Sequence, residues 1–165
     1  MSNQIAQDYV GEINESLRGL VAQYKDRDPA DLYLRPEPEE WSVIEILAHV
    51  AEFPPYWLKA FLQVIQNPGQ PFGRTHTDPQ RIAAVANHAQ DALPLTLERI
   101  EQAQAQTIEM LLTIKNEDWG KTGVHPNRGV MNLHQMMEFF VTKHIHDHTH
   151  QADKALQTVL TLRAK

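Results

Sequence analysis

Apolar residues recur at steps of three and four along most of this chain, and this spacing constrains its fold more than any other feature. The first such segment runs from about residue 3 to residue 25. Its apolar positions are Ile5, Tyr9, Ile13, Leu17, Leu20, Val21 and Tyr24. Because an α-helix turns about 100° per residue, these side chains form a single stripe, which predicts an amphipathic helix.

The second segment, "WSVIEILAHVAEF", is apolar almost all round, which predicts a helix that is buried on several sides. Ser42 is a suitable N-cap, and Glu45 three positions later completes a capping box. The Pro54-Pro55 pair is expected to break or kink this helix, with helical sequence continuing beyond it in "YWLKAFLQVIQ".

Two further helical segments follow. Asp78 and Pro79 are typical of the N-cap and first position of a helix that reaches about residue 115, with an interruption near Pro94. The last helix is predicted over about residues 132–162. The stretch between them, "GKTGVHPNRG", is rich in turn-forming residues, and no part of the chain alternates apolar and polar residues over a useful strand length.

Four long helices with loops between them predict an all-α fold, a four-helix bundle without a sheet. The chain has 165 residues, of which 42% are apolar, so we expect one domain over residues 1–165. The connection between the second and third helices is long, and a crossover or a lid is expected there.

Charge and composition exclude several classes of function. The net charge is −6 and no cluster of Lys and Arg is present, which argues against nucleic acid as a partner. No apolar run approaches the roughly 20 residues of a membrane span. Polar residues near the start, such as Gln4 and Asp8, do not fit a signal peptide, so we expect a cytoplasmic protein. There is no cysteine, and any thiol chemistry needs an external thiol.

The last helix contains "TKHIHDHTHQADKAL", in which histidines occupy every second position. Residues two apart on a helix point to nearly opposite sides, so the histidines form two pairs, His144 with His148 and His146 with His150. Within each pair the rings are one turn apart and about 40° apart around the axis, which allows two imidazoles to hold one metal ion.

The apolar stripe distinguishes the two pairs. It consists of Leu133, Met137, Phe140, Ala155, Val159 and Leu162. His144, His148 and Gln151 fall on the same side of the helical wheel, whereas His146 and His150 fall outside it. The first pair is therefore predicted to face the bundle interior and the second pair to be solvated.

Two interpretations of the inner pair remain open at this point. Histidines that face a core can simply be hydrogen-bonded packing residues, but burying two without partners leaves unpaired nitrogens. His49 lies in the strongly apolar second segment and is the candidate third ligand. Three imidazoles with open positions are typical of catalytic metal sites, and the set suits zinc, nickel or ferrous iron.

The segment "EWSVIEILAHVAE" resembles the second-helix signature of the DinB/YfiT-like superfamily of metal-binding four-helix bundles. The C-terminal "VHPNRGVMNLHQMMEFF" and "HIHDHTHQA" resemble that family's final loop and helix, in which histidines at i and i+4 are followed by Gln three residues later. His144, His148 and Gln151 match this pattern. Residues 139–143 form a run about one residue longer than the family's usual approach to its first histidine.

The resemblance implies a divalent metal held by His49, His144 and His148, and a small-molecule substrate. It implies either a hydrolase or a transferase that activates a low-molecular-weight thiol of the bacillithiol or mycothiol type. The shared chemistry is that a bound cation lowers the pKa of water or thiol. The alternatives are a metal-binding or stress-related bundle without turnover, and a scaffold that binds no metal.

Two carboxylates are candidate catalytic groups. Asp147 and Glu52 are placed to accept a proton or to orient an imidazole, and each is equally well explained as a solvated carboxylate or a helix salt bridge. Specificity is expected from the loops at 66–79 and 120–130. A homodimer is also predicted, through the first helix and apolar surface around Tyr56, Trp57 and Phe61.

Overall fold

A computed structural model of the chain describes residues 3–164. Long helices make up the bundle: α1 (Gln4–Tyr24), α3 (Val43–Gln66), α5 (Leu93–Leu112), and a C-terminal helix consisting of α6 (Leu133–Met137), a π-helical turn (Glu138–Thr142) and α7 (Lys143–Arg163). The connections carry the short helices α2 (Pro29–Leu32) and α4 (Pro79–Ala86), a 3-10 turn (Asn116–Asp118), and strands β1 (Thr122–His125) and β2 (Gly129–Asn132).

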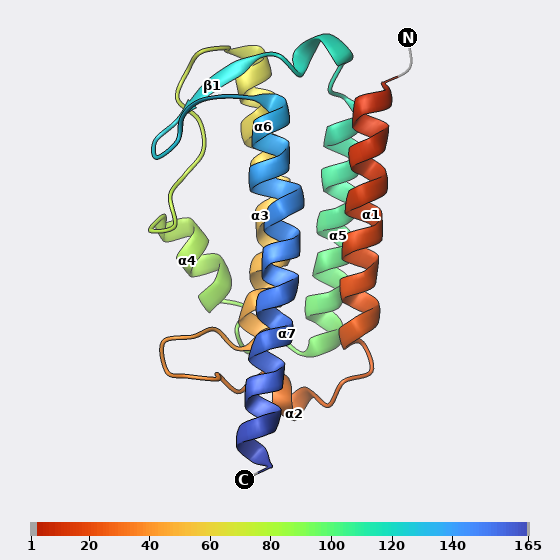
Figure 1. Cartoon of the computed structure of the whole chain (residues 1–165), viewed down its shortest axis with the longest axis vertical. Coiled ribbons are helices and arrows are strands. Elements are labelled where there is room, and N and C mark those ends of the chain that lie inside the picture. The colour runs from red at the N-terminus through yellow and green to blue at the C-terminus, as the bar shows by residue number, and fades with distance from the viewer. Residues whose placement is uncertain (1–2, 165) are drawn as a thin grey trace.

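The helices are arranged so that α3 packs against α5 and α7, and α1 packs against the same two helices from the other side. Figure 1 shows that α3 and α5 run in one direction while α1 and α6–α7 run in the other. Because α3 and α5 are parallel, residues 67–92 must return along the length of the bundle before α5 can begin. We call this segment the crossover. The sequence had indicated a crossover or lid between the second and third helices, but it placed the start of the third helix at Pro79. Residues Pro79–Ala86 instead form the short helix α4 within the crossover, and the third bundle helix begins only at Leu93, with Pro94 in its first turn.

Local sequence signals set the helix starts where they were expected. Ser42 Oγ accepts a hydrogen bond from the backbone N–H of Glu45, and the Glu45 carboxylate accepts one from the backbone N–H of Ser42. Asp78 caps α4 by accepting from the N–H of Arg81, with Pro79 at the first helical position. Such caps satisfy backbone donors that a helix terminus leaves unpaired.

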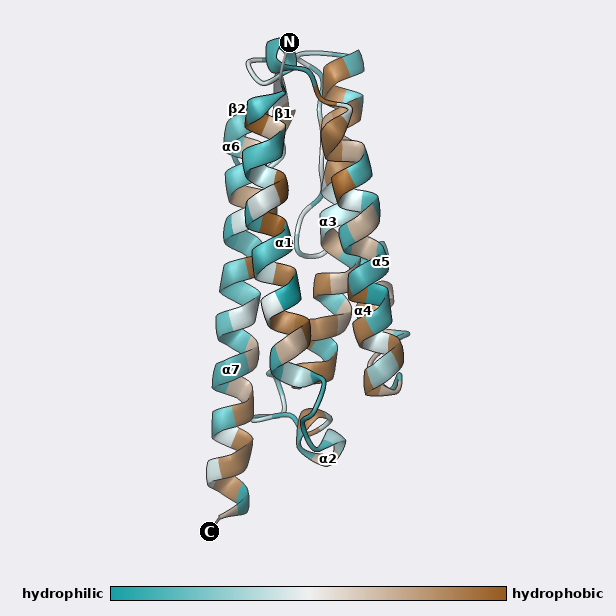
Figure 2. Cartoon of the chain, turned by 90° about the vertical axis from the view of Figure 1, so that its right-hand side faces the viewer, coloured by the Kyte–Doolittle hydropathy of each residue, from teal (hydrophilic) through white to brown (hydrophobic). Residues whose placement is uncertain are grey.

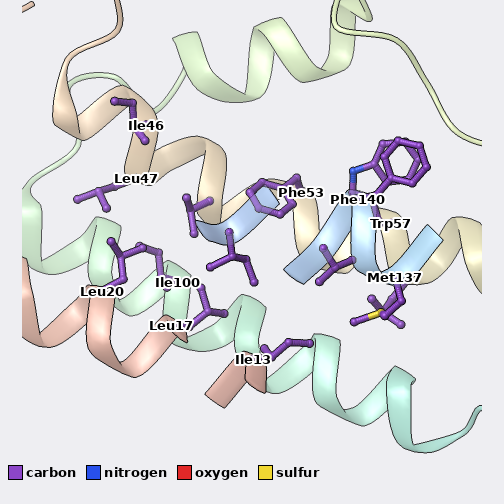
Figure 3. Close-up of a cluster of buried hydrophobic side chains, with 14 of the residues drawn as sticks. Ile13, Leu17, Leu20, Ile46, Leu47, Phe53, Trp57, Ile100, Met137 and Phe140 are labelled. Atoms are coloured by element: carbon purple, nitrogen blue, oxygen red, sulfur yellow. The ribbon is translucent and has the colours of Figure 1, made fainter. Parts of the chain in front are cut away.

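The apolar stripes meet inside the bundle. Figure 2 shows brown, hydrophobic and teal, hydrophilic residues on each long helix, and the hydrophobic positions supply most of the buried side chains. Figure 3 shows side chains from α1, α3 and α5 in contact at one end of the core, and an aromatic group at the other. There the Trp57 ring stacks on Phe140, with centroids 4.0 Å apart. This stacking fixes α3 against the C-terminal helix next to the histidines.

The expected break at Pro54-Pro55 does not occur, because α3 runs without interruption from Val43 to Gln66. Each proline removes one backbone hydrogen bond. Both prolines are buried in a helix that packs on α4, α5 and α7, so tertiary contacts hold the helix together across them.

The prediction that the fold has no sheet is also wrong, although the fold remains all-α in class. Strands β1 and β2 pair antiparallel, with His125 opposite Gly129 across a three-residue turn. Gly129 has a φ of +73°, a conformation that glycine adopts without strain. The strands have only four residues each, too short for alternation to be visible in the sequence.

This hairpin binds the crossover. The backbone N–H of Phe72 donates to the carbonyl of Val124 at 3.1 Å, and the N–H of Val124 donates to the carbonyl of Gln70 at 3.0 Å. A parallel bridge joins Pro71 to Val124. The hairpin and the crossover therefore form one wall beside α3 and the C-terminal helix.

The π-helical turn Glu138–Thr142 accounts for the extra residue seen in the sequence before the first histidine. A π turn accommodates one residue more than an α turn, so the helix continues with its inner face preserved. Met137 and Phe140 before the histidines, and Ala155 and Val159 after them, are all buried. Leu162, which the stripe also included, is 51% exposed because α7 extends beyond the bundle (Figure 1).

The apolar surface that was predicted as part of a dimer interface is mostly buried inside the protein. Trp57 and Phe61 are 6% and 0% exposed, and Tyr56 is only partly exposed, because the aromatic core takes up these rings. The homodimer stays a prediction, now without that apolar patch. Across residues 3–164, none of the helices combines the length and the apolar character of a membrane span.

Candidate metal centre

Three histidines from two helices converge at the middle of the bundle. α3 supplies His49, and α7 supplies His144 and His148 from successive turns. The Nε2 atom of His144 lies 3.4 Å from Nε2 of His49 and 3.1 Å from Nε2 of His148. One ring nitrogen from each residue lies within 4.8 Å of the other two. The sequence had predicted the convergence of these side chains.

The opposite nitrogens of two rings face oxygen atoms. Nδ1 of His148 lies 2.8 Å from Oε1 of Gln151, one turn further along α7. Nδ1 of His49 lies 3.5 Å from Oε2 of Glu52, one turn further along α3. The Gln151 oxygen is an acceptor, so Nδ1 of His148 carries the proton and its Nε2 presents a lone pair to the centre. Nδ1 of His49 forms no hydrogen bond at its distance from Glu52, but a facing carboxylate favours a proton on this nitrogen and hence the same tautomer.

This tautomer pattern fits a bound cation. Two lone pairs point at the space in front of His144, whose Nε2 carries at most one hydrogen. At least one of these lone pairs therefore has no donor among the three rings, and a bound cation would satisfy it. Nitrogens at about 2.0–2.1 Å from one tetrahedral ion lie about 3.3 Å apart, close to the separations found here.

Burial keeps the three imidazoles neutral. Burial, together with the smaller effect of the neighbouring rings, lowers the pKa of His144 to about 3 and that of His148 to about 4. Burial also lowers the pKa of His49, which Glu52 offsets only in part. Neutral imidazole is the form that coordinates a metal, so the group is in its ligand form at neutral pH.

Aromatic rings surround the group. The Phe53 ring meets His144 edge-on at a centroid distance of 4.5 Å, and the Trp41 ring lies 5.4 Å from His49 and 6.4 Å from His148. Phe53 is fully buried. These rings exclude water from one side and hold the imidazoles in place, leaving the other side open to the crossover.

The outer histidines take no part in this group. His146 is exposed, with Nε2 at 3.6 Å from Oε1 of Glu12 on α1, and His150 is exposed as well. The helical wheel therefore separated the pairs correctly, because a helix with one buried face places positions two apart on different sides.

The two candidate carboxylates differ in position. Asp147 is 57% exposed and forms an i,i+4 ion pair with Lys143 at 2.5 Å, which matches its interpretation as a surface salt bridge. Glu52 lies beside His49, and its two oxygens accept from Arg74 of the crossover at 2.5 and 2.6 Å. Burial by itself raises the pKa of Glu52, but the nearby His49 ring and the hydrogen bonds from Arg74 lower it, so the carboxylate is ionised.

A cavity of about 370 Å³ opens next to the histidines. His49 and His144 lie at its inner end, and its walls come from the crossover and the β-hairpin. Three arginines line it, Arg74, Arg81 and Arg128. Sequence reasoning placed specificity in the loops at 66–79 and 120–130 but did not single out these residues. Their spacing in the chain carries no motif, and only the folded crossover brings them together.

The fold and site define a four-helix bundle with an inward-facing histidine triad. The chain belongs to the DinB superfamily, whose family model matches residues 13–152. No curated protein matches the sequence. The resemblance to this superfamily that the histidine motif suggested is thereby confirmed.

Solved structures share the fold at low sequence identity. YfiT from Bacillus subtilis, described as a probable metal-dependent hydrolase with an unusual four-helix bundle topology, is 13% identical with a TM-score of 0.76, over 95% of this chain and 89% of that one. TT2238, a four-helix bundle protein, is 18% identical with a TM-score of 0.59, over 94% and 98%. A mutant of the mycothiol-dependent maleylpyruvate isomerase is 10% identical with a TM-score of 0.60, over 96% of this chain and 63% of that one.

Proposed function

We propose that this protein binds a divalent metal ion through His49, His144 and His148 and uses it to catalyse a reaction on a small molecule. The observation that carries the proposal is the convergence of three neutral imidazoles, one buried and two partly buried, with their Nε2 atoms facing one another. Three histidine ligands leave at least one coordination position open, as in catalytic rather than structural sites. Zinc, nickel and ferrous iron all suit this ligand set.

A divalent ion held there would lower the pKa of water or a thiol at its open position and so supply a nucleophile at neutral pH. The chain's own residues prepare the site for this. Gln151 and Glu52 hold two imidazoles in the required tautomer, Arg74 anchors Glu52, and Trp41 shields the group from solvent. Because Glu52 is ionised next to the site, we favour it as the proton acceptor over Asp147, which is exposed and paired with Lys143.

The reaction is proposed to be either hydrolysis or the transfer of an external low-molecular-weight thiol. The description of YfiT supports the first and that of the mycothiol-dependent isomerase supports the second. The open cavity beside the histidines favours an enzyme over a metal-stabilised bundle without turnover, since a structural site needs no access for substrate. A cytoplasmic location and a homodimer remain predictions, and light scattering tests the dimer.

The test starts with elemental analysis of the protein purified without a histidine tag. We expect about one divalent ion per chain. The loaded protein is then assayed against ester and amide substrates with and without added thiols such as bacillithiol or mycothiol. Absence of bound metal from the protein after incubation with zinc, nickel and ferrous iron would refute the metal site. Metal binding without turnover on any substrate would favour the non-catalytic alternative.

A further inference from the structure

The cavity beside the histidines contains more positive charge than the chain neutralises. The whole protein carries a net charge of −6, yet Arg74, Arg81 and Arg128 all line this one cavity. A cluster of positive charges in the cavity of a protein that is negative overall raises the local concentration of negatively charged ligands.

The charge of Arg74 is accounted for by the protein itself. Its guanidinium pairs with Glu52 at 2.5 Å and lies 3.9 Å from Asp78. It also lies over the ring of Tyr56, with Cζ 3.7 Å from the centroid. Arg74 is therefore a positioning residue for Glu52 and is not free to bind a ligand.

Arg81 has no such partner. Among residues 3–164 no carboxylate lies within ion-pair distance of its guanidinium; its Nη1 donates to the carbonyl of His76 at 3.0 Å, and its Cζ lies 5.1 Å from the Trp41 ring centroid. The side chain is partly buried, and its charge contributes to the lowered pKa of each of the three histidines. Arginine stays protonated under all ordinary conditions, so this is a cation near the triad that Glu52 and Asp78 influence only from beyond ion-pair distance.

Arg128 stands at the other side of the same cavity. It belongs to the turn of the β-hairpin, and its Cζ lies 3.5 Å from the centroid of Phe139. In the part of the chain that the structure describes, it too forms no ion pair with a carboxylate. Two unpaired guanidinium groups thus face one cavity, from the crossover and from the hairpin.

We propose that this cavity binds a small organic acid through its carboxylate, with Arg81 as the principal partner and Arg128 as a second contact at the hairpin side. This inference rests on the proposed function, because the acid is the substrate that the triad would act on. A guanidinium matches the planar carboxylate with two parallel hydrogen bonds. A volume of about 370 Å³ is near the lower limit for small-molecule sites, which favours a compact acid.

The test measures binding of succinate by isothermal titration calorimetry at low ionic strength, with the neutral succinamide and inorganic phosphate as comparisons. Each titration is done twice, on the zinc-loaded protein and on protein stripped of metal and then dialysed free of chelator. The variants are Arg81→Gln, Arg128→Gln and the matched control Arg18→Gln, which removes an exposed arginine on α1. Circular dichroism establishes that each variant is folded.

We expect succinate to bind the wild type and the control alike, and Arg81→Gln to weaken binding at least about tenfold, as loss of a charged hydrogen-bonding partner does. Arg128→Gln is expected to weaken it less. Succinamide is expected not to bind. Equal succinate affinity in Arg81→Gln and wild type, or tighter binding of phosphate than of succinate, would overturn the inference.

The titrations on zinc-loaded and on metal-free protein separate this inference from the proposed function. Succinate binding to the metal-free protein that depends on Arg81 supports the anion site even if the protein takes up no zinc. Zinc uptake without any succinate binding overturns the anion site and leaves the metal proposal standing.

Discussion

His148 illustrates how one residue depends on its neighbours. Its Nε2 faces His144 and its Nδ1 faces Gln151, so both nitrogens have defined roles. Removing a residue that only hydrogen-bonds to a metal ligand costs roughly 10–100-fold in metal affinity. We expect His148→Ala to cost more, because it removes a ligand itself and leaves only two of the three imidazoles. Added zinc would then no longer raise the melting temperature through linkage.

The controls for that change are His146→Ala and His150→Ala, which remove exposed rings outside the triad. Both variants should keep wild-type metal content and the zinc-induced rise in melting temperature. Metal analysis and thermal melts with and without chelator compare the three proteins. Equal metal loss in all of them would show that the triad is not the binding site.

Glu52 and Asp147 are expected to differ in their effect on metal affinity. Glu52→Gln replaces an ionised acceptor beside His49 Nδ1 and removes the partner of Arg74. We expect it to weaken metal binding by about 10–100-fold while the fold is retained. Asp147→Asn breaks only a surface pair with Lys143 and should leave metal affinity unchanged. Competition with a zinc indicator measures both, and a larger effect from Asp147→Asn would reverse these assignments.

At the scale of elements, the π-helical turn Glu138–Thr142 sets the register of the C-terminal helix. Deleting the exposed Glu138 would allow this turn to become an ordinary α turn, with the triad still facing inward. We therefore expect the deletion variant to fold and to bind metal.

Inserting one alanine after Glu138 is the opposite test. Without a further π turn to absorb it, the insertion rotates everything beyond it by about 100°, which turns His144 and His148 away from His49. Metal binding should be lost while far-UV circular dichroism still shows a helical protein. If the deletion abolishes metal binding and the insertion does not, the role given to the π turn is incorrect.

For the whole molecule, the buried histidines predict a pH dependence of stability in the metal-free state. Burial holds the pKa of His144 at about 3 and that of His148 at about 4, whereas imidazoles of the unfolded chain have a pKa of about 6.5. Below pH 6.5 the unfolded state therefore binds more protons, and the free energy of unfolding falls as the pH falls toward 4. Above pH 6.5 this contribution is constant.

Urea denaturation in chelator between pH 7.5 and pH 5 measures the effect. Carboxylates take up few protons in that window, so the slope reports mainly on histidines. We expect His148→Asn to reduce the slope between pH 6.5 and pH 5. An unchanged slope in this variant would mean that His148 is not buried in the neutral form.

The sequence by itself determined the helices and the pairing of histidines on them. Periodicity, the Ser42 and Asp78 caps and the i,i+4 spacing act within one element, and local geometry is enough to place His144 and His148 on one face. The same reasoning nominated His49, because an apolar segment that is buried on all sides must bury its histidine too.

Only the tertiary structure decided what surrounds these histidines. The Pro54-Pro55 helix stays continuous because its neighbours hold it, and the hairpin forms because four-residue strands pair with each other and with the crossover. Arg81 and Arg128 meet at one cavity only because parallel helices force the crossover back along the bundle. Contacts between residues far apart in the chain depend on packing and topology, which local periodicity does not encode.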